Sequence, residues 1–460
     1  MSNPPIRLDA GMMQNPVLKA AISKAARHLM PMLVILYFVA FLDRTNVGFA
    51  EEALKVDRGV SDGAFALGAG IFFIGYAIFE IPSNLLLKKF GARFWLARIA
   101  ITWGVVAGAF AFTTNDTMFI ILRFLLGVTE AGLFPGIIMF LAEWFPNKVR
   151  VQMFAIFYLA QPLSQMLGAP LSGGLISFGD AATPWHGWQV MFAGEGILAI
   201  AAGIAAIFLL INSPQQAKFL NDDEKLALAD VMKHEDTVRT QEGPSGIWRA
   251  MSNWKVWYFT IIYFCLQIAV YGTTFYLPQQ VSGLIGQKVG WQVGLVTAIP
   301  WLVGLVVCYV IGRAANTIVR RRRWGTWFYI LTGLAIFGSA WAGSHGQPIL
   351  GILFITIAVA SFLAVGPITW SYPTAFLTGT AAAAGIGLIN SLGNLGGFVA
   401  PLMRTGINDA MPTDSGAWGV VSLGVFALLG ALMMFGTRFF ASKSDDLLRD
   451  TLPDPVTPGH

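Results

Sequence analysis

The sequence predicts an all-α, multi-pass membrane protein with twelve transmembrane helices in two bundles of six. Three observations support this fold class. Of the 460 residues, 55% are hydrophobic and only 12% are charged, whereas about a quarter of a soluble globular chain is charged. Twelve apolar runs are long enough to cross a bilayer, and a polar stretch separates the first six from the last six. The basic residues lie mainly on one side of the predicted membrane.

The composition excludes several classes of protein. So few charged side chains cannot cover a water-exposed body of this size, which rules out a cytosolic enzyme, a disordered chain and a secreted disulfide scaffold. The net charge is only +5, and the basic residues flank apolar runs. We therefore expect a lipid bilayer around the protein and no nucleic-acid partner. Cys265 and Cys308 both lie inside apolar runs and need not pair.

The first six spans are expected near residues 29–50, 64–87, 94–113, 118–142, 151–178 and 188–211. The second six are expected near residues 254–282, 291–315, 324–344, 348–370, 372–402 and 417–441. The predicted domains are a tail without a cleavable signal at 1–27, a bundle at 28–211, a linker at 212–253, a second bundle at 254–442 and a tail at 443–460. An acid-rich segment at 221–224 is expected to begin a short amphipathic helix in the linker.

The distribution of Lys and Arg predicts the orientation. With the N-terminus inside, four of the 30 basic residues face outward, two lie within spans and 24 lie on the inner side. This asymmetry agrees with the positive-inside rule. We therefore expect both termini in the cytoplasm and the protein in the cell (inner or plasma) membrane.

Charged residues inside the predicted spans are the strongest signal of function. The first span contains Asp43 and Arg44, and the fourth contains Arg123 and Glu130. Each buried ion costs at least about 2.5–3.5 kcal/mol on insertion scales. These four side chains must therefore face one another or a water-filled cavity, which makes them candidates for the functional site.

Helical spacing suggests how these charges are arranged. Arg123 and Glu130 are seven residues apart and share a helix face, about 10 Å apart along the axis. We expect Arg123 to pair with Asp43, which leaves Arg44 and Glu130 facing the cavity. The alternative is a closed ion-pair cluster that only holds the bundle together. None of the five histidines lies deep in a span, so intramembrane proton chemistry would fall to Asp43 and Glu130.

Two further acids lie within spans. Glu80 is expected to latch to basic residues of the cytoplasmic loops, and we assign no role to Glu195 from the sequence. The chain has no His/Cys cluster with metal-ligand spacing, no Gly-x-Ser-x-Gly motif and no phosphate-binding Gly-x-x-x-x-Gly-Lys loop. We therefore expect no metal, no cofactor, no enzymatic activity and no ATP-driven pump.

Four segments resemble the major facilitator superfamily and, within it, the anion:cation symporter family. They are LDRTNVGFA at 42–50, GYAIFEIPSN at 75–84, RFLLGVTEAG at 123–132 and EWFP at 143–146. The resemblance covers residues 28–442, with the segments in the expected order. It implies two six-helix bundles around a central cavity and proton-coupled import of an organic anion by alternating access.

The resemblance also implies roles for individual residues. Arg44 would bind the substrate carboxylate, Asp43 and Glu130 would couple protons, and Arg123 would be their electrostatic partner. Four more positions match cavity-lining residues of sugar-acid symporters, although packing or helix–helix hydrogen bonding is an equal alternative: Tyr76, Gln161, Trp370 and Asn390.

The substrate and two other functions stay open. The tyrosines of the seventh span, including Tyr271, would suit an aromatic carboxylate, a sugar acid or a hydroxy acid such as tartrate. An organophosphate:phosphate antiporter of the same fold is disfavoured because it needs a second arginine in the seventh span, and residues 256–282 contain no basic residue. A ligand sensor without transport activity is the last alternative. We expect a monomer that handles a small organic anion and protons.

Overall fold

The computed structural model describes residues 15–240, 252–314, 318–376, 379–412 and 416–440. All regular elements of these ranges are helices, and ten helical segments are long and apolar enough to cross a membrane. The predicted all-α membrane fold is confirmed. The expected tail at 443–460, residues 1–14 of the N-terminal tail and residues 241–251 of the linker lie outside the described residues.

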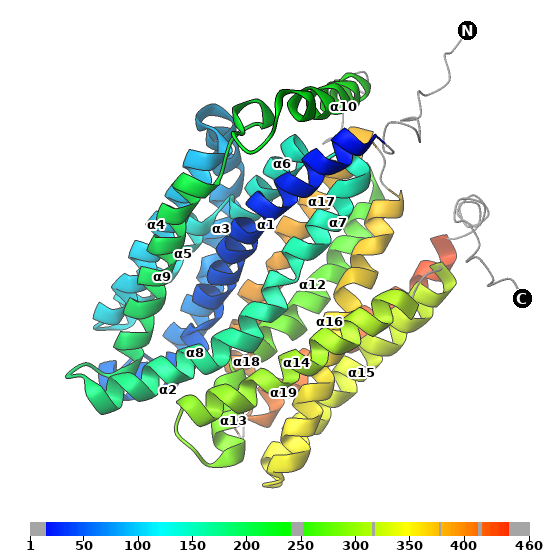
Figure 1. Ribbon diagram of the computed structural model, residues 1–460. Coiled ribbons are helices and arrows are strands. Elements are labelled where there is room, and N and C mark those ends of the chain that lie inside the picture. Colours follow the sequence, from blue (N-terminus) through cyan, green and yellow to red (C-terminus); the bar gives the residue numbers. More distant parts are fainter. Residues whose placement is uncertain (1–14, 241–251, 315–317, 377–378, 413–415, 441–460) are drawn as a thin grey trace, which may run out of the picture.

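The first half of the chain forms one group of helices, coloured blue to green in Figure 1. Its elements are α1 (Pro16–Thr45), α2 (Val47–Arg58), α3 (Asp62–Phe90), α4 (Ala92–Ala109), η2 (Phe110–Phe112), α5 (Asp116–Glu130), α6 (Leu133–Trp144), α7 (Asn147–Tyr158), α8 (Ala160–Ala182) and α9 (Gly187–Leu209). Three of the six predicted spans are each made of two consecutive helices: α1–α2, α5–α6 and α7–α8.

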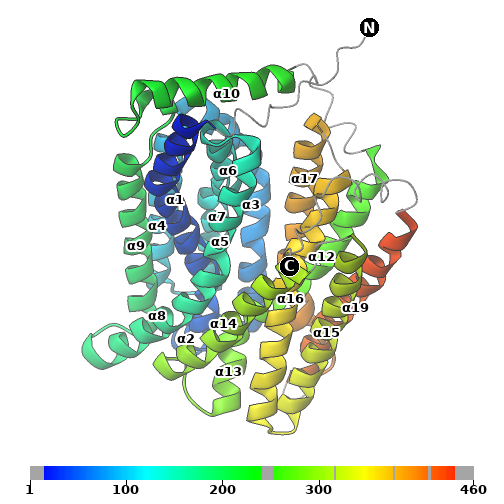
Figure 2. The same cartoon turned by 45° about the vertical axis from the view of Figure 1, so that its right-hand side comes forward.

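The second half forms a matching group, which Figure 2 shows beside the first. Its elements are α12 (Trp254–Thr274), α13 (Leu277–Ile285), α14 (Trp291–Ala314), α15 (Ile318–Ser344), α16 (Pro348–Phe376), α17 (Gly379–Asn394), α18 (Gly396–Ala410), α19 (Ala417–Gly436) and η4 (Thr437–Phe440). The eleventh span begins later than predicted, because residues 372–376 continue α16.

Two predicted spans are more polar than the ten apolar segments, yet both are long helices packed within the fold. The fifth is α7–α8, which carries Gln161, Gln165 and Asp180, and α8 packs against α1, α9 and α14. The ninth is α15, which begins at Ile318 and includes the four arginines at 320–323. It packs between α16 and α19. With these two helices the structure has the twelve spans expected from the sequence.

The linker forms η3 (Pro214–Gln216) and the 19-residue helix α10 (Asp222–Thr240). Glu224 accepts the backbone N–H of Asn221, whose side chain accepts the N–H of Glu224, so the acid-rich segment does begin this helix. Lys24 of α1 forms an ion pair with Glu224 at 2.8 Å and lowers the pKa of that carboxyl. Phe219 stacks on His28 of α1 at 4.2 Å. The α10 segment therefore rests on the first bundle (Figure 1).

The two bundles meet through α3 and α18, α8 and α14, and α2 and α13. At the end of the molecule opposite α10, backbone touches backbone: a methyl group at Gly48 of α2 would overlap the carbonyl oxygen of Phe275, and one at Gly173 of α8 would overlap that of Gly290. We call this end the α2 end. Glycine permits this close approach of the bundles because it has no Cβ.

Candidate functional site

A buried ion pair joins the first and fourth spans. The guanidinium Nη2 of Arg44 donates to Oε1 of Glu130. Arg44 is 8% exposed and Glu130 is fully buried. Each stands at the end of its helix, Arg44 one residue before α1 ends and Glu130 as the last residue of α5. A helix C-terminus favours a cation and disfavours an anion, so Arg44 stabilises a Glu130 charge that would otherwise be unfavourable there.

Aromatic rings enclose the Arg44 guanidinium. Its Cζ lies 4.6 Å from the ring centre of Phe41, 5.0 Å from that of Phe72 and 5.5 Å from that of Tyr76. Its Nη1 donates to the hydroxyl of Tyr271 at 3.4 Å, across the boundary between the bundles. Rings attract a cation and exclude water, which strengthens electrostatic interactions at this position. The predicted site residues Arg44, Glu130, Tyr76 and Tyr271 therefore lie together.

The predicted ion pair between Arg123 and Asp43 is wrong. Arg123 is buried against α3, where Nε donates to the carbonyl oxygen of Gly68 at 3.1 Å and Nη2 to that of Ala69 at 3.3 Å. These carbonyls solvate its charge in place of a carboxylate. Arg123 also lies over the Phe72 ring that contacts Arg44, at 5.3 Å. Arg123 is also close enough to attract the negative charge of Glu130, although the two side chains form no ion pair.

Asp43 points away from Arg44, because neighbouring residues on a helix are about 100° apart. It is 1% exposed and accepts the indole N–H of Trp103 on α4 at 2.9 Å. Nearby, Glu195 of α9 accepts the side-chain N–H of Asn46 and the hydroxyl of Ser172, both at 2.6 Å. Sequence reasoning missed these partners. The spacing of Asp43 and Asn46, one helical turn apart, was the available signal.

Two other predicted site residues have partners elsewhere in the second bundle. Trp370 of α16 lies edge-on to Tyr263, with ring centres 4.9 Å apart. Asn390 of α17 accepts a hydrogen bond from Asn394 at 3.1 Å. Gln161 is half-buried on α8, whereas its neighbour Gln165, which was not predicted, accepts the hydroxyl of Thr45 at 3.1 Å.

The prediction for Glu80 is wrong. Glu80 is 8% exposed and accepts the hydroxyl of Ser391 at 3.3 Å, so its partner belongs to the other bundle and not to a basic loop. Glu80 lies one turn beyond Tyr76 on the same face of α3, which explains this orientation. Lys88 and Lys89 lie two turns further along α3.

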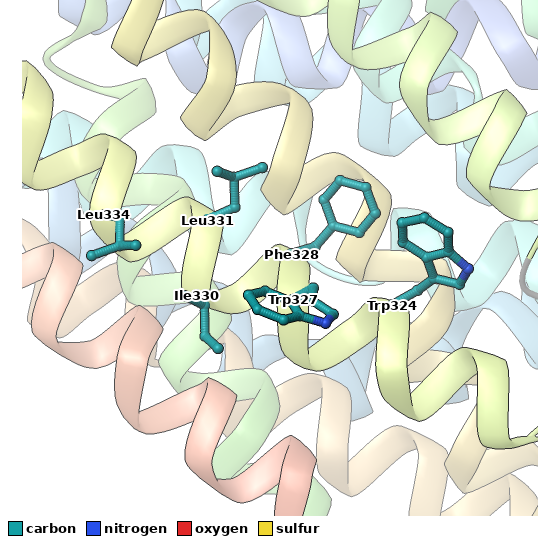
Figure 3. A pocket seen from close by; sticks show the side chains of 6 residues that line it. All are labelled: Trp324, Trp327, Phe328, Ile330, Leu331 and Leu334. Atoms are coloured by element: carbon teal, nitrogen blue, oxygen red, sulfur yellow. The ribbon is translucent and has the colours of Figure 1, made fainter.

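An aromatic pocket is lined by side chains of α15 and by none of these charged residues (Figure 3). Its lining is almost entirely apolar: Trp324, Trp327, Phe328, Ile330, Leu331 and Leu334. Four of these side chains are exposed at the surface, and Phe328 and Ile330 are half-buried. Such a surface suits lipid chains better than an anion. In the described part of the chain, no group of three His, Cys, Asp or Glu side chains is arranged to hold a metal ion.

Comparisons with known proteins agree on one family. A family model described as "Major Facilitator Superfamily" matches residues 33–401. The chain is 39% identical to "Inner membrane transport protein RhmT" of Escherichia coli (strain K12), over 93% of this chain and 97% of that protein. It is 38% identical to a "Putative tartrate transporter" of Agrobacterium vitis, over 92% of both chains. It is 37% identical to "Putative metabolite transport protein NicT" of Pseudomonas putida, over 87% and 90%.

Solved structures show the same fold at low sequence identity. A bacterial homologue of the human lysosomal transporter Spinster superposes with a TM-score of 0.66 at 14% identity, over 96% of this chain and 100% of that chain. A D-xylose-proton symporter superposes with a TM-score of 0.67 at 17% identity, over 89% and 97%. The family model and the named relatives confirm the superfamily resemblance that the four sequence segments indicated, and the solved structures share its fold.

Proposed function

The chain belongs to the major facilitator superfamily, and we propose that it imports a small organic carboxylate together with protons by alternating access. Its named relatives are transporters and not enzymes. Two of them carry the name putative tartrate transporter, at 38% identity, so a hydroxy acid such as tartrate is our first choice of substrate. A sugar acid or an aromatic carboxylate is the next.

The buried pair of Arg44 and Glu130 is the observation that carries this proposal. Arg44 is in contact with both bundles through Glu130 and Tyr271. The planar guanidinium binds a carboxylate through two parallel hydrogen bonds, so a substrate carboxylate would compete with Glu130 for the same donors.

Competition at Arg44 would couple the substrate to a proton. A displaced Glu130 would be a buried anion without its cation, since Arg123 is already bonded to Gly68 and Ala69. An unpaired buried carboxylate is strongly disfavoured and takes up a proton instead. Substrate binding at Arg44 and protonation of Glu130 would therefore favour each other, as a symporter requires.

The basic residues and the contacts between the bundles support an orientation of the protein in the membrane. The basic runs at 88–89 and 320–323 lie toward the same end as α10, which we propose to be the cytoplasmic end. The α2 end, where Gly48 meets Phe275, would then face outward and is closed by direct backbone contact. On this assignment both termini are cytoplasmic, the protein lies in the cell membrane, and the site is closed toward the outside.

Transport in reconstituted vesicles tests the proposal. Purified protein would be placed in vesicles with an imposed inward proton gradient, and uptake of labelled tartrate, a sugar acid and an aromatic carboxylate would be followed. We expect one of these carboxylates to accumulate above its external concentration, and a protonophore to abolish the accumulation. Uptake that never exceeds equilibrium on a proton gradient would contradict the proposed symport.

The two alternatives make different predictions. An organophosphate antiporter would exchange phosphate for a phosphate ester, yet α12 has no arginine facing the Arg44 site. A sensor would bind a carboxylate without moving it across the membrane. Phosphate exchange and carboxylate flux in the same vesicles distinguish these functions from symport.

A further inference from the structure

A second acidic cluster lies in the first bundle, on the side of α1 away from the Arg44–Glu130 pair. It consists of Asp43 on α1 and Glu195 on α9, each 1% exposed. Asn46 and Ser172 donate to the two oxygens of Glu195 at 2.6 Å. The two carboxylates are near enough for their charges to repel each other.

No cation balances this cluster within the part of the chain that the structure describes. Neither acid forms an ion pair there, and Arg44 is bonded to Glu130. The negative charge of Glu130 repels an ionised Asp43 and so adds to the effect of Glu195. Near the two ends of α9, charged residues of the neighbouring helices have partners of their own, such as Trp188, Trp95 and backbone groups: Asp57, Arg58, Arg93, Arg98 and Asp180. On α1 and α2, Lys24 pairs with Glu224 and Lys55 pairs with Asp62.

The hydrogen bonds of the cluster leave acceptors without donors. Asp43 uses one oxygen to accept the Trp103 indole, while its Oδ1 is buried with no partner among the described residues. The side-chain oxygen of Asn46, one turn further along the same helix face, is also buried and without a partner there. Buried acceptors are almost always satisfied. A protonated carboxyl group would supply the missing donor, since only the protonated form carries an O–H.

We propose that Glu195 is a proton-carrying residue of the transport cycle, which shares a proton with Asp43 at a site separate from Glu130. This inference rests on the proposed proton-coupled transport. Two neighbouring carboxylates in an apolar bundle do not both ionise and titrate as one coupled pair. Glu195 takes up a proton while the site faces outward and releases it while the site faces the cytoplasm.

Asn46 connects this proton to the movement of the bundles. It is the residue at which α1 ends and α2 begins, and its amide N–H donates to Glu195. Two residues later, Gly48 lies against Phe275 of the other bundle. An ionised Glu195 accepts this hydrogen bond more strongly than a protonated one. The charge of Glu195 therefore acts directly on the segment that closes the α2 end.

The number of protons moved per substrate tests the inference. Accumulation would be measured in vesicles at several pH gradients, with the membrane potential held at zero. Each coupled proton multiplies the accumulation ratio about tenfold per pH unit. We expect Glu195→Gln, which keeps the size and hydrogen-bonding capacity of the side chain, to move one proton fewer and so to accumulate about tenfold less substrate per pH unit than the parent. An unchanged slope in Glu195→Gln would overturn the inference.

A second variant keeps the test decisive if Glu195→Gln does not fold. Ser172→Ala removes one donor to the ionised Glu195 but leaves the carboxyl group in place. It should move the pH profile of uptake to higher pH, because the charged form loses a hydrogen bond, while the slope of accumulation stays that of the parent. A purely structural Glu195 would leave the pH profile in place, and that result would also overturn the inference. Failure of the parent itself to accumulate substrate on a pH gradient would instead contradict the proposed symport.

Discussion

Arg44 and Tyr271 belong to different bundles, yet the guanidinium of one donates to the hydroxyl of the other at 3.4 Å. Glu130, the ion-pair partner of Arg44, lies in the same bundle as Arg44. Arg44 is thus a buried charge that contacts both bundles of the protein. A substrate carboxylate bound to it would lie at the boundary between the bundles, where its presence affects how they pack.

Replacing Arg44 tests whether it binds the substrate anion. We expect Arg44→Lys to weaken substrate binding by about 10- to 100-fold, because a single ammonium cannot reproduce the bidentate hydrogen bonds of a guanidinium. Isothermal titration of the purified variants with the transported carboxylate measures this effect. Arg98→Lys is the matched control, since Arg98 is half-buried over Trp95 and away from the site. Near-normal affinity in Arg44→Lys would exclude Arg44 as the anion-binding residue.

Replacing Glu130 tests the coupling step. Glu130→Gln imitates the protonated acid permanently and removes the competitor for Arg44. The variant should bind substrate at least as tightly as the parent and still exchange labelled for unlabelled substrate across vesicles. It should concentrate substrate less on an inward proton gradient, by about tenfold per pH unit for the one proton lost, because this position no longer changes its charge. If Glu130→Gln accumulates substrate as well as the parent does, coupling would have to depend on Asp43 and Glu195.

Adding a methyl group at Gly48 tests the closed α2 end. In Gly48→Ala the new Cβ overlaps the carbonyl oxygen of Phe275, so the bundles cannot approach as closely. Overpacking of this kind costs about 1–3 kcal/mol, which corresponds to roughly a 5- to 150-fold loss in uptake rate if this contact forms in each cycle. Gly63→Ala is the control, because nothing lies within 4 Å of a Cβ at that position. Equal uptake by the two variants would contradict closure at the α2 end.

The contact between Lys24 and Glu224 predicts how docking of α10 depends on pH. Lys24 lowers the pKa of Glu224 from its ordinary value of 4.5. The contact therefore stabilises the docked linker fully above pH 4.5, and this contribution is lost as the pH falls through the lowered pKa. Hydrogen exchange in α10 should be constant between about pH 5 and 8 after correction for the intrinsic rate. Glu224→Gln should raise this exchange, and Asp223→Asn, at an exposed neighbour, should not.

The twelve spans and the buried charges were predictable because both follow from the cost of placing polar groups in lipid. The pairing of those charges was not. Asp43 and Arg44 are adjacent in sequence, and the rotation of α1 decides that one faces Trp103 and the other Glu130. That rotation depends on packing between helices, which spacing along one helix does not reveal. For the same reason, Glu80 was assigned to the loops although it faces α17.

The breaks between consecutive helices differ in how clearly the sequence marks them. The break after Glu130 falls at Gly132, whose φ of 87° is a conformation that glycine readily adopts. The break at Asn46 has no glycine or proline to mark it, since Asn46 keeps a right-handed helical conformation. Tertiary contacts, including the hydrogen bond from Asn46 to Glu195, determine where α1 ends.

The contact between α8 and α14 has a mechanical consequence. Gly173 of α8 faces the backbone of Gly290, and Gly294 of α14 faces the backbone of Ala169. At these positions no large side chain projects into a groove of the partner helix. One helix can therefore roll over the other without first withdrawing a side chain from such a groove. Rotation about this contact therefore meets a low steric barrier, and the two helices stay in contact while more distant parts of the bundles move furthest. If the bundles rock during the proposed transport cycle, we expect them to pivot where α8 crosses α14.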